Sequence, residues 1–151
     1  MATYVFLDQA PLTLACKGPS NAKAEKCREW IRGLQAKGYV VLIPEIADYE
    51  ARRAFLGAGN LDWLRQLDAL SAVALVPLTR SAVLKAAEFW ALLRTTGLGT
   101  AGLESLDCDA ILAAQAVTTV QPHDTVIVAT GNPRHLDRFP GVTAYNWLYL
   151  S

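Results

Sequence analysis

The stretch Leu106–Val117, LDCDAILAAQAV, decides the fold of this chain. Two carboxylates, Asp107 and Asp109, precede an alanine-rich run whose small side chains would let a helix lie close to a neighbouring element. The first turn of a helix carries unpaired N–H groups and a partial positive charge, which together stabilise an acid. The simplest interpretation makes Asp107 the N-cap and Asp109 a first-turn acid. A second interpretation makes Asp109 one of several acids, distant in sequence, that gather around a divalent metal.

The composition fits one folded domain that spans residues 1–151. Of the 151 residues 52% are hydrophobic and 19% are charged, which is typical of a globular protein with a full core. The formal net charge is zero, so any surface that binds nucleic acid has to be local. Three cysteines without CxxC spacing and only two histidines argue against disulfides and against a zinc site, and they favour a reducing cytoplasm. The apolar run at residues 69–78 is too short to span a bilayer, so we expect a cytoplasmic protein without a membrane segment.

Apolar runs that predict buried strands alternate with amphipathic stretches that predict helices. The predicted strands are residues 4–7, 39–43, 73–78, 126–129 and 142–147. The predicted helices are residues 22–37, 44–57, 61–70, 79–96 and 106–117, with a short helical or irregular piece at 133–139. This alternation, without repeats or linkers, is the signature of a three-layer α/β fold around a central parallel sheet of about five strands.

The glycine-rich stretch Gly97–Gly102, GLGTAG, matches the GxGxxG pattern of dinucleotide-binding proteins letter by letter. That pattern has its function only where a strand precedes it and a helix follows it within one βαβ unit. A long predicted helix precedes it in this chain. We therefore interpret the stretch as a connection between two helices.

Four oxygen-bearing side chains fall at positions where a parallel sheet binds its ligands. Asp8 follows the first predicted strand and Asn132 follows the fourth. Glu50 lies one turn into the helix after the second strand, and Asp109 begins the helix that leads towards the fourth. Ligands of such sheets bind beyond the carboxyl ends of the strands, so all four side chains converge if the first and fourth strands are central neighbours. Carboxylate and amide oxygens are ligands for Mg²⁺ or Mn²⁺, and such a site can activate water for attack on a phosphodiester.

The same residues lie in segments that resemble PIN-domain ribonucleases, and among them the VapC toxins of toxin–antitoxin pairs. The matching segments, spread from Val5 to Phe139, are VFLDQAPL, VLIPEIADYEARRAFL, LDCDAILAAQA and VIVATGNPRHLDRF. The resemblance implies a sheet ordered 3-2-1-4-5. It also implies that the acidic metal ligands are Asp8, Glu50 and Asp109. Asn132 matches a fourth position that is commonly Asp in these enzymes, and Thr130 matches a small hydroxyl residue beside the site.

The resemblance further implies a Mg²⁺- or Mn²⁺-dependent endoribonuclease that forms a homodimer and is bound by an antitoxin whose tail occupies the acidic groove. Its catalytic residues would be Asp8, Glu50, Asp109 and Asn132. Further candidates to support the metal ligands are Glu45, Asp107 and Thr130. The candidates to contact RNA phosphates are Arg53 and Arg134; such contacts position a strand without reading its sequence. Neighbouring helical residues project about 100° apart, so at most one of Arg52 and Arg53 faces the site.

Two alternatives stay open. In the first, the chain is a non-catalytic PIN-like binding or assembly module. The amide at Asn132 and the zero net charge favour this alternative. In the other it is a metal-dependent phosphohydrolase that acts on small phosphate esters. The second is less favoured because only Asp8-Gln9-Ala10 follows the first strand, where such enzymes carry a DxD motif.

Overall fold

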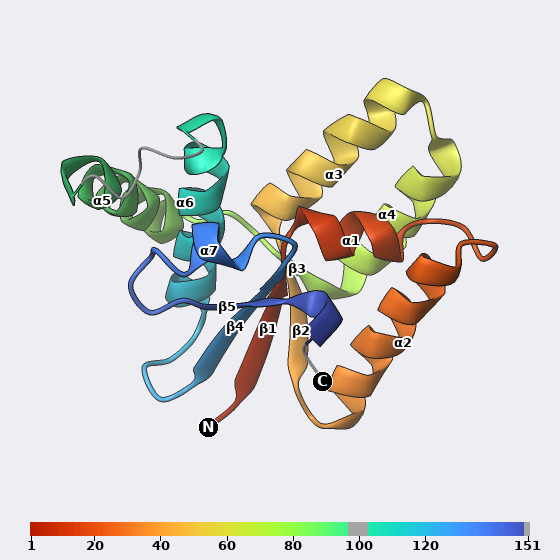
Figure 1. Ribbon diagram of the computed structural model, residues 1–151, viewed down its shortest axis with the longest axis horizontal. Coiled ribbons are helices and arrows are strands. Elements are labelled where there is room, and N and C mark those ends of the chain that lie inside the picture. The colour runs from red at the N-terminus through yellow and green to blue at the C-terminus, as the bar shows by residue number, and fades with distance from the viewer. Residues whose placement is uncertain (97–102, 150–151) are drawn as a thin grey trace.

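The structure is a computed structural model, which describes residues 1–96 and 103–149. Five parallel strands form one sheet in the order β3-β2-β1-β4-β5 (Figure 1). The strands are β1 (Thr3–Leu7), β2 (Val40–Pro44), β3 (Leu75–Val76), β4 (Thr125–Thr130) and β5 (Thr143–Asn146). Both the parallel sheet and the strand order 3-2-1-4-5 are confirmed. Strands β1 and β4 are central neighbours, so their carboxyl ends meet at one edge of the sheet.

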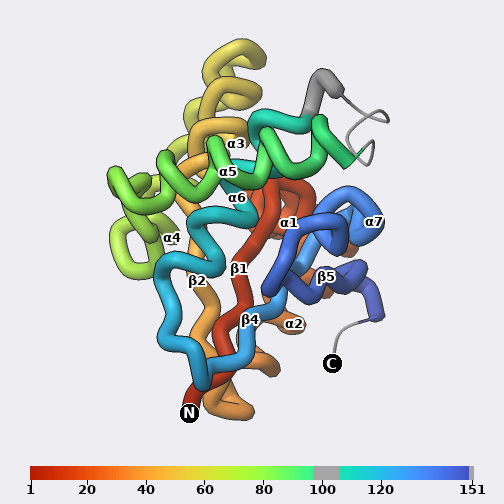
Figure 2. Tube along the Cα trace, turned by 90° about the vertical axis from the view of Figure 1, so that its left-hand side faces the viewer, coloured from red at the N-terminus to blue at the C-terminus, as the bar shows by residue number. Residues whose placement is uncertain are grey.

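Helices cover both faces of the sheet. They are α1 (Gln9–Ala15), α2 (Ala22–Ala36), α3 (Glu45–Ala58), α4 (Leu61–Ala74), α5 (Arg80–Thr96), α6 (Leu103–Thr119) and α7 (Pro133–Leu136), followed by a 3-10 turn at Trp147–Tyr149. Successive residues of β1 point to opposite faces of the sheet and contribute to two hydrophobic cores. Val5 and Leu7 pack with α1 to α4, whereas Phe6 packs with α5, α6 and the α7 segment. Figure 2 views the face that α5 and α6 cover. Within the described ranges, no helix is both long and apolar enough to cross a membrane.

The central helix begins earlier than predicted. Helix α6 starts at Leu103, so Asp107 and Asp109 are its fifth and seventh residues. Because only the first four N–H groups of a helix lack a partner within it, the prediction of an N-cap and a first-turn acid was wrong. Leu103 and Glu104 precede the two acids in the sequence. Leu and Glu are good helix formers, so the helix begins before the acids. The glycine-rich stretch at residues 97–102 lies outside the described residues.

The region around β3 also differs from the prediction. Helix α4 runs to Ala74, and β3 has only two residues where a strand over 73–78 was predicted. An edge strand pairs on one side only, so little burial favours its extension over continuation of the helix. Helix α1 was not predicted, since its seven residues carry no clear apolar stripe. It begins immediately after β1, with Asp8 as its N-cap.

A buried glutamine fixes how α3 and α6 lie against each other. Gln115 of α6 is 1% exposed, and its Oε1 accepts a hydrogen bond of 3.1 Å from the backbone N–H of Ile46 at the start of α3. Its Nε2 donates to the carbonyl of Val76 at 2.9 Å. A buried helix N-terminus needs acceptors for its unpaired N–H groups, and Gln115 supplies one from a neighbouring helix. This contact sets the relative position of the two helices that carry Glu50 and Asp109.

Candidate metal and catalytic site

Asp8 lies where the two central strands end. Its backbone N–H donates to the carbonyl of Ala129 at 2.9 Å, which continues the pairing of β1 with β4. Its Oδ1 accepts from the N–H of Gln9 at 2.7 Å, and its Oδ2 accepts from the hydroxyl of Thr130 at 2.7 Å. Thr130 is 1% exposed. The Asp8 carboxylate is therefore held in one orientation by two neutral donors, at the edge where the strand pattern placed it.

Glu50 faces this edge from α3. Its side chain is 15% exposed, and its pKa is raised from 4.5 to about 7, first by burial and then by the charge of Asp8. The guanidinium of Arg53, 4.0 Å away, lowers the pKa in part, and the charge of Asp109 raises it further. A negative charge raises the pKa of a carboxyl group only when it lies near that group. Asp8, which follows β1, and Asp109 of α6 therefore both act on the charge of Glu50 in α3.

Asp109 is oriented towards the segment that follows β4. Its side chain is 13% exposed, and its Oδ2 lies 3.5 Å from Nη2 of Arg138 and 3.5 Å from Nδ1 of His135. Sequence reasoning missed the pairing of Arg138 and His135 with this acid. The only signal in the sequence was two basic residues three positions apart behind the Gly-Asn-Pro turn.

Asn132 lies beside the acids with its side chain open to solvent. Its backbone N–H donates to the hydroxyl of Thr130 at 3.0 Å, and its own side chain makes no capping hydrogen bond to α7. Thr130 thus links the Asp8 carboxylate to the backbone of Asn132. This arrangement leaves the amide of Asn132 accessible from outside the protein.

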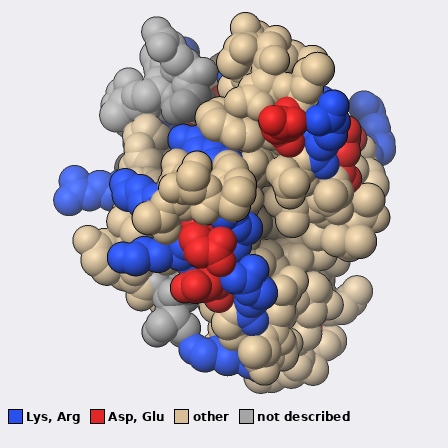
Figure 3. Space-filling view, turned by 90° about the vertical axis from the view of Figure 1, so that its right-hand side faces the viewer, with Lys and Arg blue, Asp and Glu red and all other residues tan. Residues whose placement is uncertain are grey.

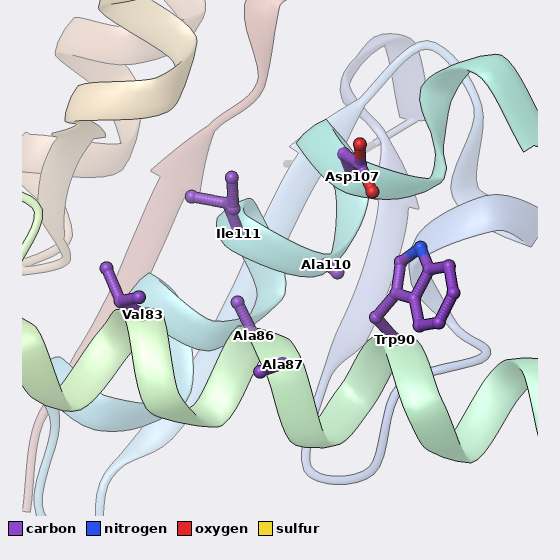
Figure 4. Close-up of a pocket in the computed structure, with 7 residues that line it drawn as sticks. All are labelled: Val83, Ala86, Ala87, Trp90, Asp107, Ala110 and Ile111. Atoms are coloured by element: carbon purple, nitrogen blue, oxygen red, sulfur yellow. The ribbon is translucent and has the colours of Figure 1, made fainter.

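Glu45 and Asp107 lie in other surroundings. Oε1 of Glu45 accepts a hydrogen bond of 2.8 Å from the N–H of Leu78, so this acid anchors the loop that follows β3. Asp107 and Asp109 are two residues apart, which is about 200° around a helix. Asp107 lines a hollow of about 390 Å³ between α5 and α6, next to Trp90 and Ile111 (Figure 4). It therefore lies on the side of α6 that faces α5.

The two arginines of α3 point to different neighbours. Arg52 binds Asp48 and Asp68, with N–O distances of 2.9 Å and 2.8 Å. Arg53 lies near Glu50 with its side chain 55% exposed. Arg134 in α7 is exposed as well. Arg53 and Arg134 are therefore accessible to a ligand, whereas Arg52 is engaged in the structure.

The acids suit a hard cation in kind, since carboxylate oxygens are the ligands that Mg²⁺ and Mn²⁺ prefer. Within residues 1–96 and 103–149, however, no three His, Cys, Asp or Glu side chains are close enough to form a ready metal-binding group. Burial raises the pKa of Glu50 most, and the negative charges of Asp8 and Asp109, which a divalent cation would offset, raise it further. Binding Mg²⁺ with oxygens about 2.1 Å away would require the carboxylates to close around the ion.

The three-layer arrangement of helices on both faces of a 3-2-1-4-5 sheet (Figure 1) defines a PIN-like fold. Solved structures support this class. A chain of the VapBC2 complex from Rickettsia felis, bound to a promoter DNA fragment, is similar with a TM-score of 0.73 at 16% identity over 95% of this chain and 98% of that one. For FitAcB from Neisseria gonorrhoeae the TM-score is 0.64 at 19% identity over 97% and 99%. For DNA-bound VapBC from Salmonella typhimurium it is 0.65 at 21% identity, again over 97% and 99%.

No protein-family model and no curated protein sequence matches the chain. The likeness to these structures is therefore one of fold. At that level it confirms the PIN-like fold that the sequence segments predict.

Proposed function

We propose that the chain is a Mg²⁺- or Mn²⁺-dependent endoribonuclease of the VapC toxin type. The observation that carries this proposal is that Asp8, which follows β1, and Asp109 of α6 both lie near enough to Glu50 of α3 to raise its pKa. The shared fold with chains of VapBC and FitAB complexes supports it. Strongly perturbed pKa values cluster at functional sites.

In this proposal Asp8, Glu50 and Asp109 hold the metal, and the accessible amide of Asn132 orients the attacking water or the metal. A bound Mg²⁺ would stabilise charge on the phosphodiester and acidify the water that attacks it in line. Asp8 needs no reorientation, because Gln9 and Thr130 already fix its carboxylate.

The other residues of the proposed site act on the RNA or on a proton. Glu50, whose pKa is raised to about 7, would give up its proton on binding a cation. The exposed guanidinium groups of Arg53 and Arg134 contact the flanking phosphates.

The proposed partners are RNA, a second copy of the chain in a homodimer and a cognate antitoxin protein. An acidic edge favours a partner segment that carries basic residues. Positive charge is concentrated elsewhere, since residues 17–37 hold six Lys and Arg and only two Asp and Glu. Figure 3 shows Lys and Arg side chains spread over the face to which α2 belongs. In a chain without net charge, such a local surface is what would attract a polyanion.

The test is cleavage of a labelled RNA with Mg²⁺ and with EDTA by Asp8→Asn, Asp109→Asn and the control Asp62→Asn. Asp62 is an exposed acid of α4, paired only with the neighbouring Arg65 among the described residues. The first two variants should lose Mg²⁺-dependent cleavage while they keep the thermal unfolding transition, and the control should cleave as the unchanged protein does. Full cleavage by both Asp8→Asn and Asp109→Asn would remove the proposed site.

A second candidate function is a PIN-like module that binds a partner without turnover. The lack of a ready three-residue metal group in the described part of the chain favours it. Binding of Mn²⁺ measured by electron paramagnetic resonance, together with RNA turnover, separates the two functions. A catalytic protein binds the ion and cleaves RNA, whereas the module does neither and still binds its partner.

A further inference from the structure

Arg138 is a buried cation at the proposed site. Its side chain is 12% exposed, compared with 55% for Arg53, which lies near Glu50. Arginine keeps its charge under all conditions in a protein, so a buried guanidinium needs acidic or carbonyl oxygens around it. The oxygen atoms that surround the Arg138 guanidinium therefore indicate its role.

The side chain of Arg138 is held from two directions. Its Nε donates to the carbonyl of His135 at 2.8 Å, which ties it to the last turn of α7. Its guanidinium carbon lies 5.7 Å from the ring centroid of Phe139, which is 2% exposed and packs against Phe89 in the core. A guanidinium fixed in this way has lost its rotamer freedom on folding, before any ligand arrives. It therefore acts as a rigid part of the site.

The charged end of Arg138 meets one oxygen of Asp109. Nη2 is shielded from solvent and lies 3.5 Å from Oδ2, and Nδ1 of His135 lies 3.5 Å from the same oxygen. Both contacts reach across from the segment after β4 to α6. Asp8 is oriented by neutral donors, so the two acids are held by different means. A fixed positive charge therefore lies beside the carboxylate of Asp109.

We propose that Arg138 is a positioning residue that holds the Asp109 carboxylate at the acid cluster in the orientation that cation binding needs. This inference rests on the proposed metal-dependent function. Groups that orient a metal ligand through its remaining oxygen or nitrogen typically contribute about 10- to 100-fold in metal affinity or activity. A positive charge so close to a ligand also repels the cation, and the inference states that orientation outweighs this repulsion.

The experiment measures Mn²⁺ affinity without RNA, by electron paramagnetic resonance, for the unchanged protein, Arg138→Gln, Arg138→Lys and the control Arg65→Gln. Arg65 is an exposed arginine of α4 that pairs with Asp62 and has no part in the proposed site. Arg138→Gln should weaken binding about 10- to 100-fold. Arg138→Lys keeps the charge and should recover part of this loss, and Arg65→Gln should bind as the unchanged protein does. Lys lacks the Nε contact with His135 that fixes the guanidinium, so binding by Arg138→Lys should lie between that of Arg138→Gln and that of the unchanged protein.

The possible results separate the role of Arg138 from the proposed function. Equal or tighter Mn²⁺ binding by folded Arg138→Gln overturns the role of Arg138 and leaves the proposed function intact. Should Arg138→Gln not fold, Arg138→Lys decides: weaker binding supports the inference and unchanged binding overturns it. If the unchanged protein binds no Mn²⁺ and cleaves no RNA, the proposed function fails and the role of Arg138 fails with it.

Discussion

Two acids on α3, Asp48 and Glu50, are equally buried and yet have opposite surroundings. Their side chains are 12% and 15% exposed. Asp48 accepts from Nε and Nη2 of Arg52 at 2.9 Å and 3.1 Å and from the hydroxyl of Ser71 at 2.6 Å. Burial acts to raise the pKa of Asp48, but the hydrogen bonds from Arg52 and Ser71 outweigh it, and the pKa lies below its ordinary value.

Glu50, about 200° further around the helix, faces the two acids instead. Burial and the charge of Asp8 raise its pKa to about 7. At similar burial, the neighbouring side chains therefore decide whether the pKa of an acid is lowered, as for Asp48, or raised, as for Glu50. Asp48 joins α3 to α4 through Ser71, whereas Glu50 lies near the like charges of Asp8 and Asp109.

The largest expected effect is a difference in RNA cleavage between a variant of Glu50 and a variant of Asp48. Glu50→Gln should reduce Mg²⁺-dependent RNA cleavage by more than about 100-fold, because losing even a group that orients a metal ligand costs about 10- to 100-fold. Asp48→Asn should retain cleavage within a few-fold per folded molecule. Initial rates on one labelled RNA, with the folded fraction measured for each variant, give the comparison. Equal losses in the two variants would show that the two acids do not differ in function.

The next effect concerns stability against pH without metal. Because the folded pKa of Glu50 is raised from 4.5 to about 7, the folded state binds a proton more tightly than the unfolded state does. Stability is therefore lost as pH rises from about 4.5 to 7, by up to about 3 kcal/mol for a shift of this size. Glu50→Gln carries no charge at any pH and should be more stable than the unchanged protein above pH 7.

This prediction is measured by urea unfolding in EDTA at several pH values. The stability difference between Glu50→Gln and the unchanged protein should be largest at pH 8 and should vanish near pH 4, where Glu50 is protonated in both states. A difference that does not depend on pH would contradict the like-charge environment of Glu50.

A smaller effect of opposite sign is expected at Asp48. Asp48→Asn removes the charge that Arg52 and Ser71 bind and should destabilise the protein by about 2 kcal/mol at pH 7. The figure is below that of a fully buried pair because the side chain of Arg52 is 34% exposed. The folded pKa of Asp48 is lowered, so its contribution is present above pH 4 and is lost as pH falls through the folded pKa. Urea unfolding at pH 7 and pH 2.5 checks it, with Asp62→Asn as the exposed control.

The contrast between these acids also shows what the sequence predicts. The convergence of Asp8 and Glu50 follows from strand periodicity and from the rule that parallel sheets bind ligands at their carboxyl edge. The pairing of Asp48 with Arg52 is an i, i+4 contact and is open to sequence reasoning. The bond from Ser71 is not, because it depends on how α4 packs against α3.

The same limit explains the other residues that sequence reasoning missed. Gln115 and Arg138 act through contacts with segments far away in the chain or across a turn, and no periodic pattern encodes such contacts. The start of α6 was placed too late because a pair of acids before an alanine run looks like a cap, although good helix formers precede it. Local patterns therefore specify the elements and the edge where the acids lie. Packing decides which donors surround each acid.

The smallest effect is the response of the two acids to Mg²⁺ itself. An ion that binds only the folded state stabilises it by about 1.4 kcal/mol at ten times its dissociation constant, which is a shift in Tm of about 4 °C for a chain of this size. Asp48→Asn should keep this shift, since Asp48 is bonded to Arg52 and Ser71 on the far side of α3. Glu50→Gln should lose most of it, because one of the three acids that would share the ion no longer carries charge. Thermal unfolding with Mg²⁺ and with EDTA measures the difference, and a full Mg²⁺ shift in Glu50→Gln would show that the ion binds elsewhere.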